Sequence, residues 1–186
     1  MPLPGSERAD AFLRWADGVA DQAEPQHQLF SDGGAPPITA VTYRNRPWAG
    51  WTFGVTYGAS MYTPACIEFV TVVRSRSFLW TWAIADFVDR HRDDLQDLGV
   101  EDTINWREPI AKHSNMDAFV VAPPVSLDPE LHVVHIDDDD HHVQLLQAIP
   151  VYASELELVR ELGAKQFFGQ VGEDALNPRR PPFARP

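Results

Sequence analysis

The chain has 186 residues, of which 44% are hydrophobic, and this is enough apolar material to bury the core of one domain of ordinary size. Its 15 Lys and Arg residues against 27 Asp and Glu residues give a net charge of −12, which opposes binding to the phosphate backbone of nucleic acids. Because Cys66 is the single cysteine, an intrachain disulfide and a zinc site built from several thiolates are excluded.

The N-terminal half predicts one helix and three strands. Apolar residues recur at helical spacing after Ser6, a good N-cap residue, and predict a helix over residues 6–23. Residues 24–37 are rich in turn-forming types and predict a loop. β-Branched and aromatic residues then predict strands at 38–43, 51–58 and 66–73. The third strand is apolar almost throughout, so we expect it at the centre of a sheet, with Cys66 as a small core residue.

The C-terminal half predicts two more helices and three more strands. Apolar residues on one helical face predict a long helix over 77–98, and residues 100–117 have no sustained period and predict a loop. Strands are expected at 118–122, 131–136 and 142–149. Ser154 and Glu157 form a capping box that opens a helix ending at Gly163, and a short turn follows it.

Strands neither alternate strictly with helices nor run together without them, so the sequence predicts the α+β class. We expect a mixed or antiparallel sheet of about five or six strands packed against three or four helices. The predicted organisation is a single domain over residues 1–176, with a core over about 36–170. A tail rich in Pro and Arg follows at 177–186 and is not expected to form regular structure.

The stretch HIDDDDHH, at residues 135–142, allows two interpretations. If its aspartates form a hairpin loop, His135 and His142 lie side by side on a polar face, and Asp137 could complete the metal site of a hydrolase. Such a third ligand would come from a loop tip, whereas catalytic sites hold their ligands on fixed elements. We therefore favour a solvated acidic tip that contacts a partner protein, formed by Asp137, Asp138, Asp139 and Asp140.

A second candidate for partner binding is the predicted loop between the first two strands. Trp48 lies in this loop beside Arg44 and Arg46, and Trp and Arg are enriched among the residues that dominate protein interfaces. The other patterns indicate neither a nucleophile elbow nor a phosphate-binding loop. The sequence therefore predicts no catalytic residue and no cofactor, and the chain is expected not to be an enzyme.

Two segments resemble the bacterial members of the suppressor-of-fused domain family. The first is a threonine-aromatic-glycine-x-serine stretch on an early strand, with Thr56, Tyr57, Gly58 and Ser60. The second is a late strand that runs into a helix closed by glycine, with Ile149, Pro150, Tyr152, Glu155, Leu156, Glu157, Leu158 and Gly163. A terminal segment with Asn177, Pro178 and Arg179 follows in the order typical of the family.

The resemblance implies a binding module without catalysis. Many bacterial members of this family are thought to be immunity proteins that neutralise polymorphic toxins, so the expected partner is a protein, in particular a basic toxin effector bound through an acidic surface. The alternatives are the metal-dependent hydrolase at His135, Asp137 and His142, and an intracellular scaffold or regulator that binds an extended peptide. No oligomeric state is indicated.

The sequence also bears on the compartment. The most apolar run, at residues 78–88, is too short to cross a bilayer and leads directly into charged residues. The first residues lack the basic region and apolar core of a secretory signal. We therefore expect a cytoplasmic protein that binds neither membranes nor nucleic acid.

Overall fold

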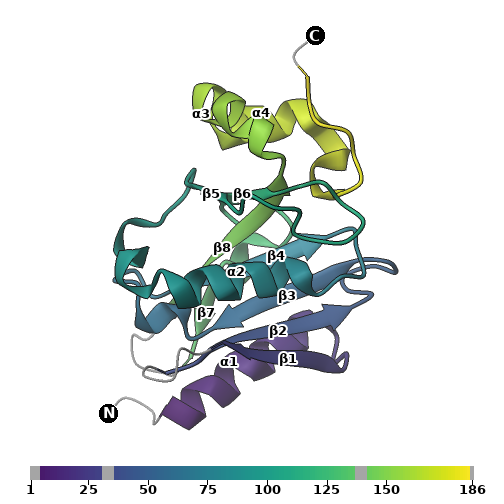
Figure 1. Ribbon diagram of the computed structural model, residues 1–186. Helices are drawn as coiled ribbons and strands as arrows, with labels where there is room; N and C mark the ends of the chain where they lie inside the picture. The colour runs from purple at the N-terminus through teal and green to yellow at the C-terminus, as the bar shows by residue number, and fades with distance from the viewer. Residues whose placement is uncertain (1–4, 31–35, 137–141, 185–186) are drawn as a thin grey trace.

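The computed structural model describes residues 5–30, 36–136 and 142–184 (Figure 1). Within these ranges the chain forms one sheet of eight strands: β1 (Pro25–Phe30), β2 (Ile38–Arg44), β3 (Thr52–Tyr57), β4 (Ile67–Val73), β5 (Thr103–Asn105), β6 (Ala118–Ala122), β7 (Val133–His135) and β8 (His142–Val151). Four α-helices accompany it: α1 (Gly5–Val19), α2 (Leu79–Arg90), α3 (Leu156–Leu162) and α4 (Ala164–Val171).

The sheet is mixed. Its strand order is β1-β2-β3-β4-β8-β6-β5, and β7 pairs with the first part of β8 beside β6. Only β4 and β8 run parallel, with Ile67 opposite Gln144, and the other described pairs are antiparallel. The predicted α+β class and mixed sheet are confirmed, whereas the expected five or six strands were too few.

The two strands that the sequence analysis missed are the edges of the sheet. β1 lies in the turn-rich stretch 24–37, and four of its six residues are polar or proline. β5 has three residues and lies in the stretch 100–117 that was predicted to be a loop. An edge strand is hydrogen-bonded on one side only and need not be apolar on both faces, so neither segment has the hydrophobic pattern of an inner strand.

Helices cover both faces of the sheet (Figure 1). One face packs against α2 through Phe69, Trp80 and Ile84, and the other packs against α1 through Phe12 and Val70. The contact with α2 is close, because a Cβ atom added at Gly54 on β3 would lie 1.9 Å from Oγ1 of Thr81 on the helix. Successive residues of a strand point to opposite faces, and this alternation accounts for the two separate cores.

Both long helices are shorter than predicted. α1 ends at Val19 rather than near residue 23, and Asp21 and Gln22 adopt left-handed backbone angles, with φ of 50° and 51°. α2 ends at Arg90, and a 3-10 helix, η2 (Arg92–Asp97), replaces the predicted last turns of the helix over 77–98. The change of direction places the Arg92 guanidinium inside the fold, where Nη1 donates to the Tyr62 hydroxyl at 2.8 Å.

A third packed layer lies at the end of β6 and β8. There α3 and α4 bury Leu156, Val159 and Phe167 against residues of both strands. A 3-10 helix, η4 (Ala153–Glu155), precedes α3, and α4 replaces the short turn that was predicted after Gly163. No helix in the described ranges has the length and apolar character needed to cross a membrane.

Candidate functional site

Four loops meet at the end of the sheet where β4 finishes and α2 begins. They are the segments 44–51, 74–78, 111–115 and 177–181, and residues from all four line two adjoining hollows. These segments contain no acidic residue, although the whole chain has 27. They contain seven of its 15 cations: Arg44, Arg46, Arg74, Arg76, Lys112, Arg179 and Arg180. The meeting of these loops therefore concentrates positive charge in an otherwise acidic protein.

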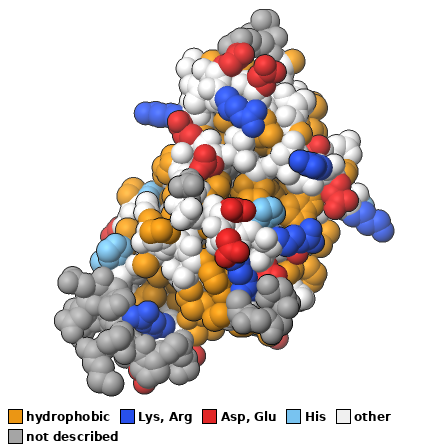
Figure 2. All heavy atoms as spheres, turned by 60° about the vertical axis from the view of Figure 1, so that its left-hand side comes forward, with side chains coloured by type: hydrophobic (Ala, Val, Ile, Leu, Met, Phe, Trp, Pro, Cys, Tyr) orange, Lys and Arg blue, Asp and Glu red, His pale blue; other side chains and the backbone are white. Residues whose placement is uncertain are grey.

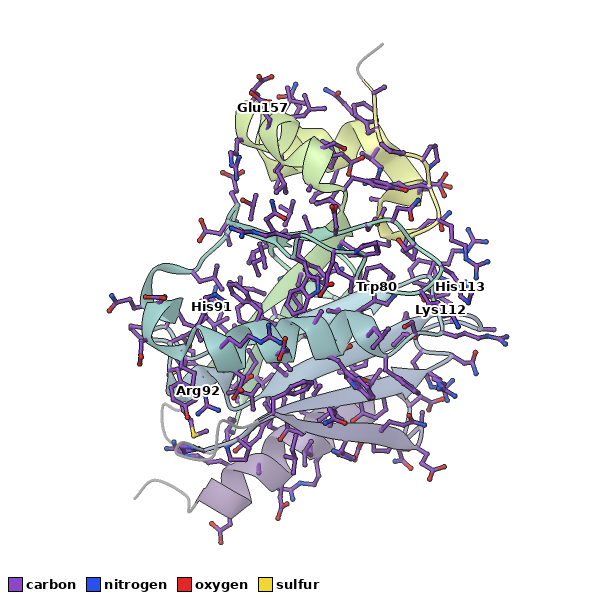
Figure 3. All side chains as sticks on the ribbon, in the orientation of Figure 1. Trp80, His91, Arg92, Lys112, His113 and Glu157 are labelled. Atoms are coloured by element: carbon purple, nitrogen blue, oxygen red, sulfur yellow. The ribbon has the colours of Figure 1, made fainter. Side chains whose placement is uncertain are left out.

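The two hollows share Ser75, Arg76 and Arg179 and form one elongated depression, which we call the basic cleft. The larger hollow, of about 540 Å³, is lined by Gly50, Arg74, Ser75, Arg76, Asn177 and Arg179. The smaller, of about 290 Å³, is lined by Ser75, Arg76, Ser77, Trp80, Ala111, Lys112, His113, Ser114, Pro178 and Arg179. Figure 3 shows Lys112 and His113 near Trp80 at one end of α2, with His91 and Arg92 at the other.

The charged groups of the basic cleft are exposed and unpaired. Arg74, Arg76, Lys112 and Arg179 all have exposed side chains, and none of them forms an ion pair with a described residue. The face in Figure 2 differs, because acidic and basic side chains are interspersed there. Trp80 also lines the smaller hollow, although its side chain is fully buried, and its Nε1 has no acceptor among the described residues.

A buried ion pair holds the C-terminal segment at the cleft. Nη1 and Nη2 of Arg180 lie 2.6 and 2.8 Å from the two carboxylate oxygens of Glu155, and both side chains are at most 3% exposed. Glu155 also accepts hydrogen bonds from the backbone N–H groups of Tyr152 and Phe183. Such a two-pronged pair sets the position of the chain on either side of it, including the adjacent Arg179.

Of the predicted partner-binding residues, Trp48 is 57% exposed and packs edge-on against Trp51, with ring centroids 5.0 Å apart. Arg44 lies over the Phe78 ring, with its guanidinium carbon 3.9 Å from the centroid. Arg46 turns away toward α1, donating to the Ala20 carbonyl at 2.6 Å. The structure therefore places an exposed indole on an anchored loop beside the basic cleft, with one of the two arginines committed to holding the loop.

The two histidines predicted as possible metal ligands lie at the opposite end of the sheet. His135 and His142 are paired across β7 and β8, and both are exposed. Asp137, Asp138, Asp139 and Asp140 lie outside the described residues. Within the ranges that the structure describes, no group of three His, Cys, Asp or Glu side chains is arranged to hold a metal ion.

The threonine-aromatic-glycine-x-serine stretch surrounds a buried carboxylate on β4. Glu68 is 0% exposed and accepts hydrogen bonds from the hydroxyls of Thr56 and Ser60 and from the backbone N–H groups of Gly58, Ala59 and Ser60, at 2.7 to 3.2 Å. Burial raises the pKa of Glu68 above its usual value of 4.5, although the hydrogen bonds act in the opposite direction. The motif therefore shapes the turn after β3.

Cys66 is exposed, so its expected role as a small core residue was wrong. It immediately precedes β4 and adopts a left-handed backbone conformation, with φ of 50°. The side chain therefore does not follow the in-and-out alternation of the strand, which begins one residue later.

A comparison with protein-family models matches residues 34–181 to the suppressor of fused protein family. The chain belongs to the suppressor-of-fused family. This confirms the resemblance seen in the two motifs. No curated protein sequence matches the chain.

Solved structures with the suppressor-of-fused fold are similar to the whole chain. A suppressor-of-fused homologue from Neisseria gonorrhoeae has a TM-score of 0.73 at 14% identity, over 96% of this chain and 97% of that one. A chain in the Sufu–Fu complex has a TM-score of 0.66 at 16% identity, over 93% of this chain and 91% of its own. Drosophila Suppressor of Fused has the same TM-score and identity over 97% of this chain. The match covers 53% of the Drosophila chain, so this chain spans about half the length of that protein.

No sequence pattern predicted that the cations of the basic cleft lie together. Arg74 and Arg76 occur in a short loop, Lys112 in a segment without period and Arg179 in the tail. The available signal was the absence of acidic residues from four separate loops, which becomes informative only when the topology brings those loops together.

Proposed function

We propose that this chain is a non-enzymatic protein-binding module whose partner docks at the end of the sheet that carries Trp48. The observation that carries the proposal is the 57% exposed Trp48 indole, which packs against Trp51 beside a cleft whose arginines form no ion pair with a described residue. Large aromatic and arginine side chains supply most of the binding energy at protein interfaces. A protein partner is also supported by the family, since a related chain occurs in the Sufu–Fu complex.

The loop is suited to this role because it is anchored before any partner arrives. The backbone N–H of Gly50 donates to Oδ1 of Asn45 at 3.0 Å, and the N–H of Trp51 donates to the carbonyl of Trp48 at 3.0 Å. Arg46 adds the hydrogen bond to Ala20. Ordering a loop during binding costs free energy, so a loop that is already ordered loses less affinity to that cost.

We further propose that the partner is a basic toxin effector and that the chain acts as an immunity protein. The support is the family resemblance together with a net charge of −12, which attracts a basic protein and speeds its encounter. Asp137, Asp138, Asp139 and Asp140 lie outside the described residues, and we propose them as further contacts for a basic surface of this partner. Arg44 and Arg46 belong to the proposed interface through their loop.

The test is a pull-down of the product of the adjacent gene with the purified chain, followed by calorimetry of the pair. Trp48→Ala is expected to weaken binding by about 2 kcal/mol or more, as for other interface tryptophans. Val125→Ala is the control, because Val125 is 65% exposed and follows β6 at the other end of the sheet.

The outcomes separate the two parts of the proposal. Capture of the neighbour with unchanged affinity for Trp48→Ala would reject the Trp48 surface and leave the immunity role. Failure to capture the neighbour would reject the immunity role.

A second candidate, the metal-dependent hydrolase, is favoured by the direct pairing of His135 with His142. Two imidazoles on adjacent strands can share an ion, and a carboxylate such as Asp137 would supply the third ligand. Metal analysis of protein purified without a histidine tag tests it. Stoichiometric metal and a melting temperature lowered by chelator would support this candidate, and absence of both would reject it.

A further inference from the structure

The polar groups that line the basic cleft are hydrogen-bond donors with few competing acceptors. Arg76, Lys112 and Arg179 contribute three cations to the lining. The serines of the lining can act in either sense. No carboxylate of a described residue lines either hollow, so the cleft is unsuited to a cation and suited to an anion.

The cations are held together by the backbone rather than by opposite charges. The N–H of Arg74 donates to the carbonyl of Leu176 at 2.9 Å, which joins the 74–78 loop to the C-terminal segment. The Ser114 hydroxyl donates to the carbonyl of Pro178 at 2.6 Å, which joins that segment to the 111–115 loop. Like charges placed close together repel one another, and an anionic ligand would relieve this repulsion.

The shape of the cleft favours a chain of charges over a single small ion. The hollows of about 540 and 290 Å³ adjoin at Arg76 and Arg179, with Arg74 at one end and Lys112 at the other. Gly50 belongs to the larger hollow, so the depression continues into the loop that exposes Trp48. An extended segment could therefore place several negative groups along the cleft and an apolar group at Trp48.

We propose that the basic cleft binds an acidic polypeptide segment of the partner, with its carboxylates against Arg74, Arg76, Lys112 and Arg179. The inference rests on the proposed protein-binding function and adds the chemistry of the segment that is recognised. A polypeptide fits better than a nucleic acid, because the charge of −12 on the whole chain opposes a phosphate backbone extending beyond the cleft.

The test measures binding of a fluorescein-labelled, glutamate-rich peptide to the full chain by fluorescence anisotropy. A peptide of the same length with glutamine in place of every glutamate serves as the uncharged probe. The wild-type chain should bind the glutamate peptide, and added salt should weaken the complex. Arg76→Glu/Arg179→Glu is expected to reduce the affinity by a factor of about ten or more.

The control for charge is Lys165→Glu, a single reversal on the exposed side of α4 that is compared with Arg76→Glu alone. It should leave the peptide affinity within about a factor of two, since distant surface charges are screened. Melting temperatures of all variants verify that the fold is retained. Equal loss of binding in Lys165→Glu would show that net charge rather than the cleft is responsible and would overturn the proposal.

Three further results would overturn it: no binding of the glutamate peptide, equal binding of the glutamine peptide, or tighter binding of a single-stranded oligonucleotide of the same charge. The peptide assay is independent of the adjacent gene product. Loss of the pull-down with retained, cleft-dependent peptide binding would therefore reject the immunity role and support the cleft. Capture of the gene product without peptide binding would support the immunity role and reject the cleft as a binding site for an acidic segment.

Discussion

At the scale of single residues, Glu68 has a buried carboxylate whose hydrogen-bond partners are all donors. Its carboxylate is fully buried and is met only by donors, namely three backbone N–H groups and two hydroxyls. An amide in its place would direct an NH₂ group at some of these donors. A buried backbone N–H that loses its acceptor costs about 1–3 kcal/mol.

Glu68→Gln is therefore expected to lower the free energy of unfolding by about 2 kcal/mol at neutral pH. The pH dependence should change as well. Because burial raises the pKa of Glu68 in the folded state above 4.5, the folded protein binds more protons than the unfolded chain. The part of the stability that comes from binding this proton is then fully present below pH 4.5 and is lost as the pH rises through the folded-state pKa. Urea unfolding at a series of pH values across this range measures this dependence. If the free energy of unfolding of Glu68→Gln varied with pH as it does in the wild-type chain, the dependence would not come from Glu68.

The pair of Glu155 and Arg180 gives a second prediction at this scale. Removing one partner leaves the other charged and buried, so Arg180→Met should cost about 3–5 kcal/mol, and Glu155→Gln should cost a similar amount. The double variant should cost roughly 2 kcal/mol less than the sum.

Urea denaturation of the four proteins of this cycle provides the measurement. The same replacement at Arg90, which pairs with Asp86 at 2.8 Å but is 66% exposed, should change stability by less than about 1 kcal/mol. Additive losses in the cycle would show that the two side chains act independently.

Among the elements, α2 depends most on a single position of the sheet. It approaches β3 so closely at Gly54 that the neighbouring hydroxyls of Thr71 and Thr81 lie 2.7 Å apart. Any side chain on Gly54 would enter the space of Thr81. The sheet and the helix cannot separate without disrupting Trp80, which is fully buried immediately before Thr81 in the same helix.

We expect Gly54→Ala to destabilise the fold by about 1–3 kcal/mol, because the added methyl group overlaps Thr81. The control is Gly169→Ala in α4, where no atom lies within 4 Å of the added Cβ atom. Alanine is favoured over glycine in a helix, so this variant should be stabilised by up to about 1 kcal/mol. Thermal unfolding distinguishes the two, and equal effects would rule out the steric explanation.

Inner elements were predictable and edge elements were not. β6 occupies the predicted residues 118–122, since a run of apolar residues of that length is typical of a strand buried on both faces. β1 and β5 lack such a pattern because each pairs with one neighbour only. The early end of α2 also left no periodic signal, because it depends on the burial of Arg92 against Tyr62 from a distant loop.

At the scale of the whole molecule, positive charge is concentrated at one end of the sheet. The four loops of the basic cleft contain seven of the 15 cations and no acidic residue, although the chain has 27 acidic residues. The net charge could be predicted from composition, but this concentration of cations could not. It requires the parallel pairing of β4 with β8, which no local pattern encodes.

The net charge gives a prediction about encounter with a basic partner. We expect the association rate to fall by about tenfold or more as ionic strength rises from low salt toward physiological values, with a smaller change in the dissociation rate. Stopped-flow mixing of the chain with the adjacent gene product measures both rates. An association rate indifferent to salt would exclude long-range electrostatic steering.

The parallel ladder also has a consequence for the order of folding. β1 to β4 are joined by successive short connections, so their antiparallel pairs can form from local encounters. The pairing of Ile67 with Gln144 instead closes a loop spanning much of the chain, and the entropy of that closure must be met before the contacts form. We therefore expect β1 to β4 to pair with one another early in folding and β4 to pair with β8 late.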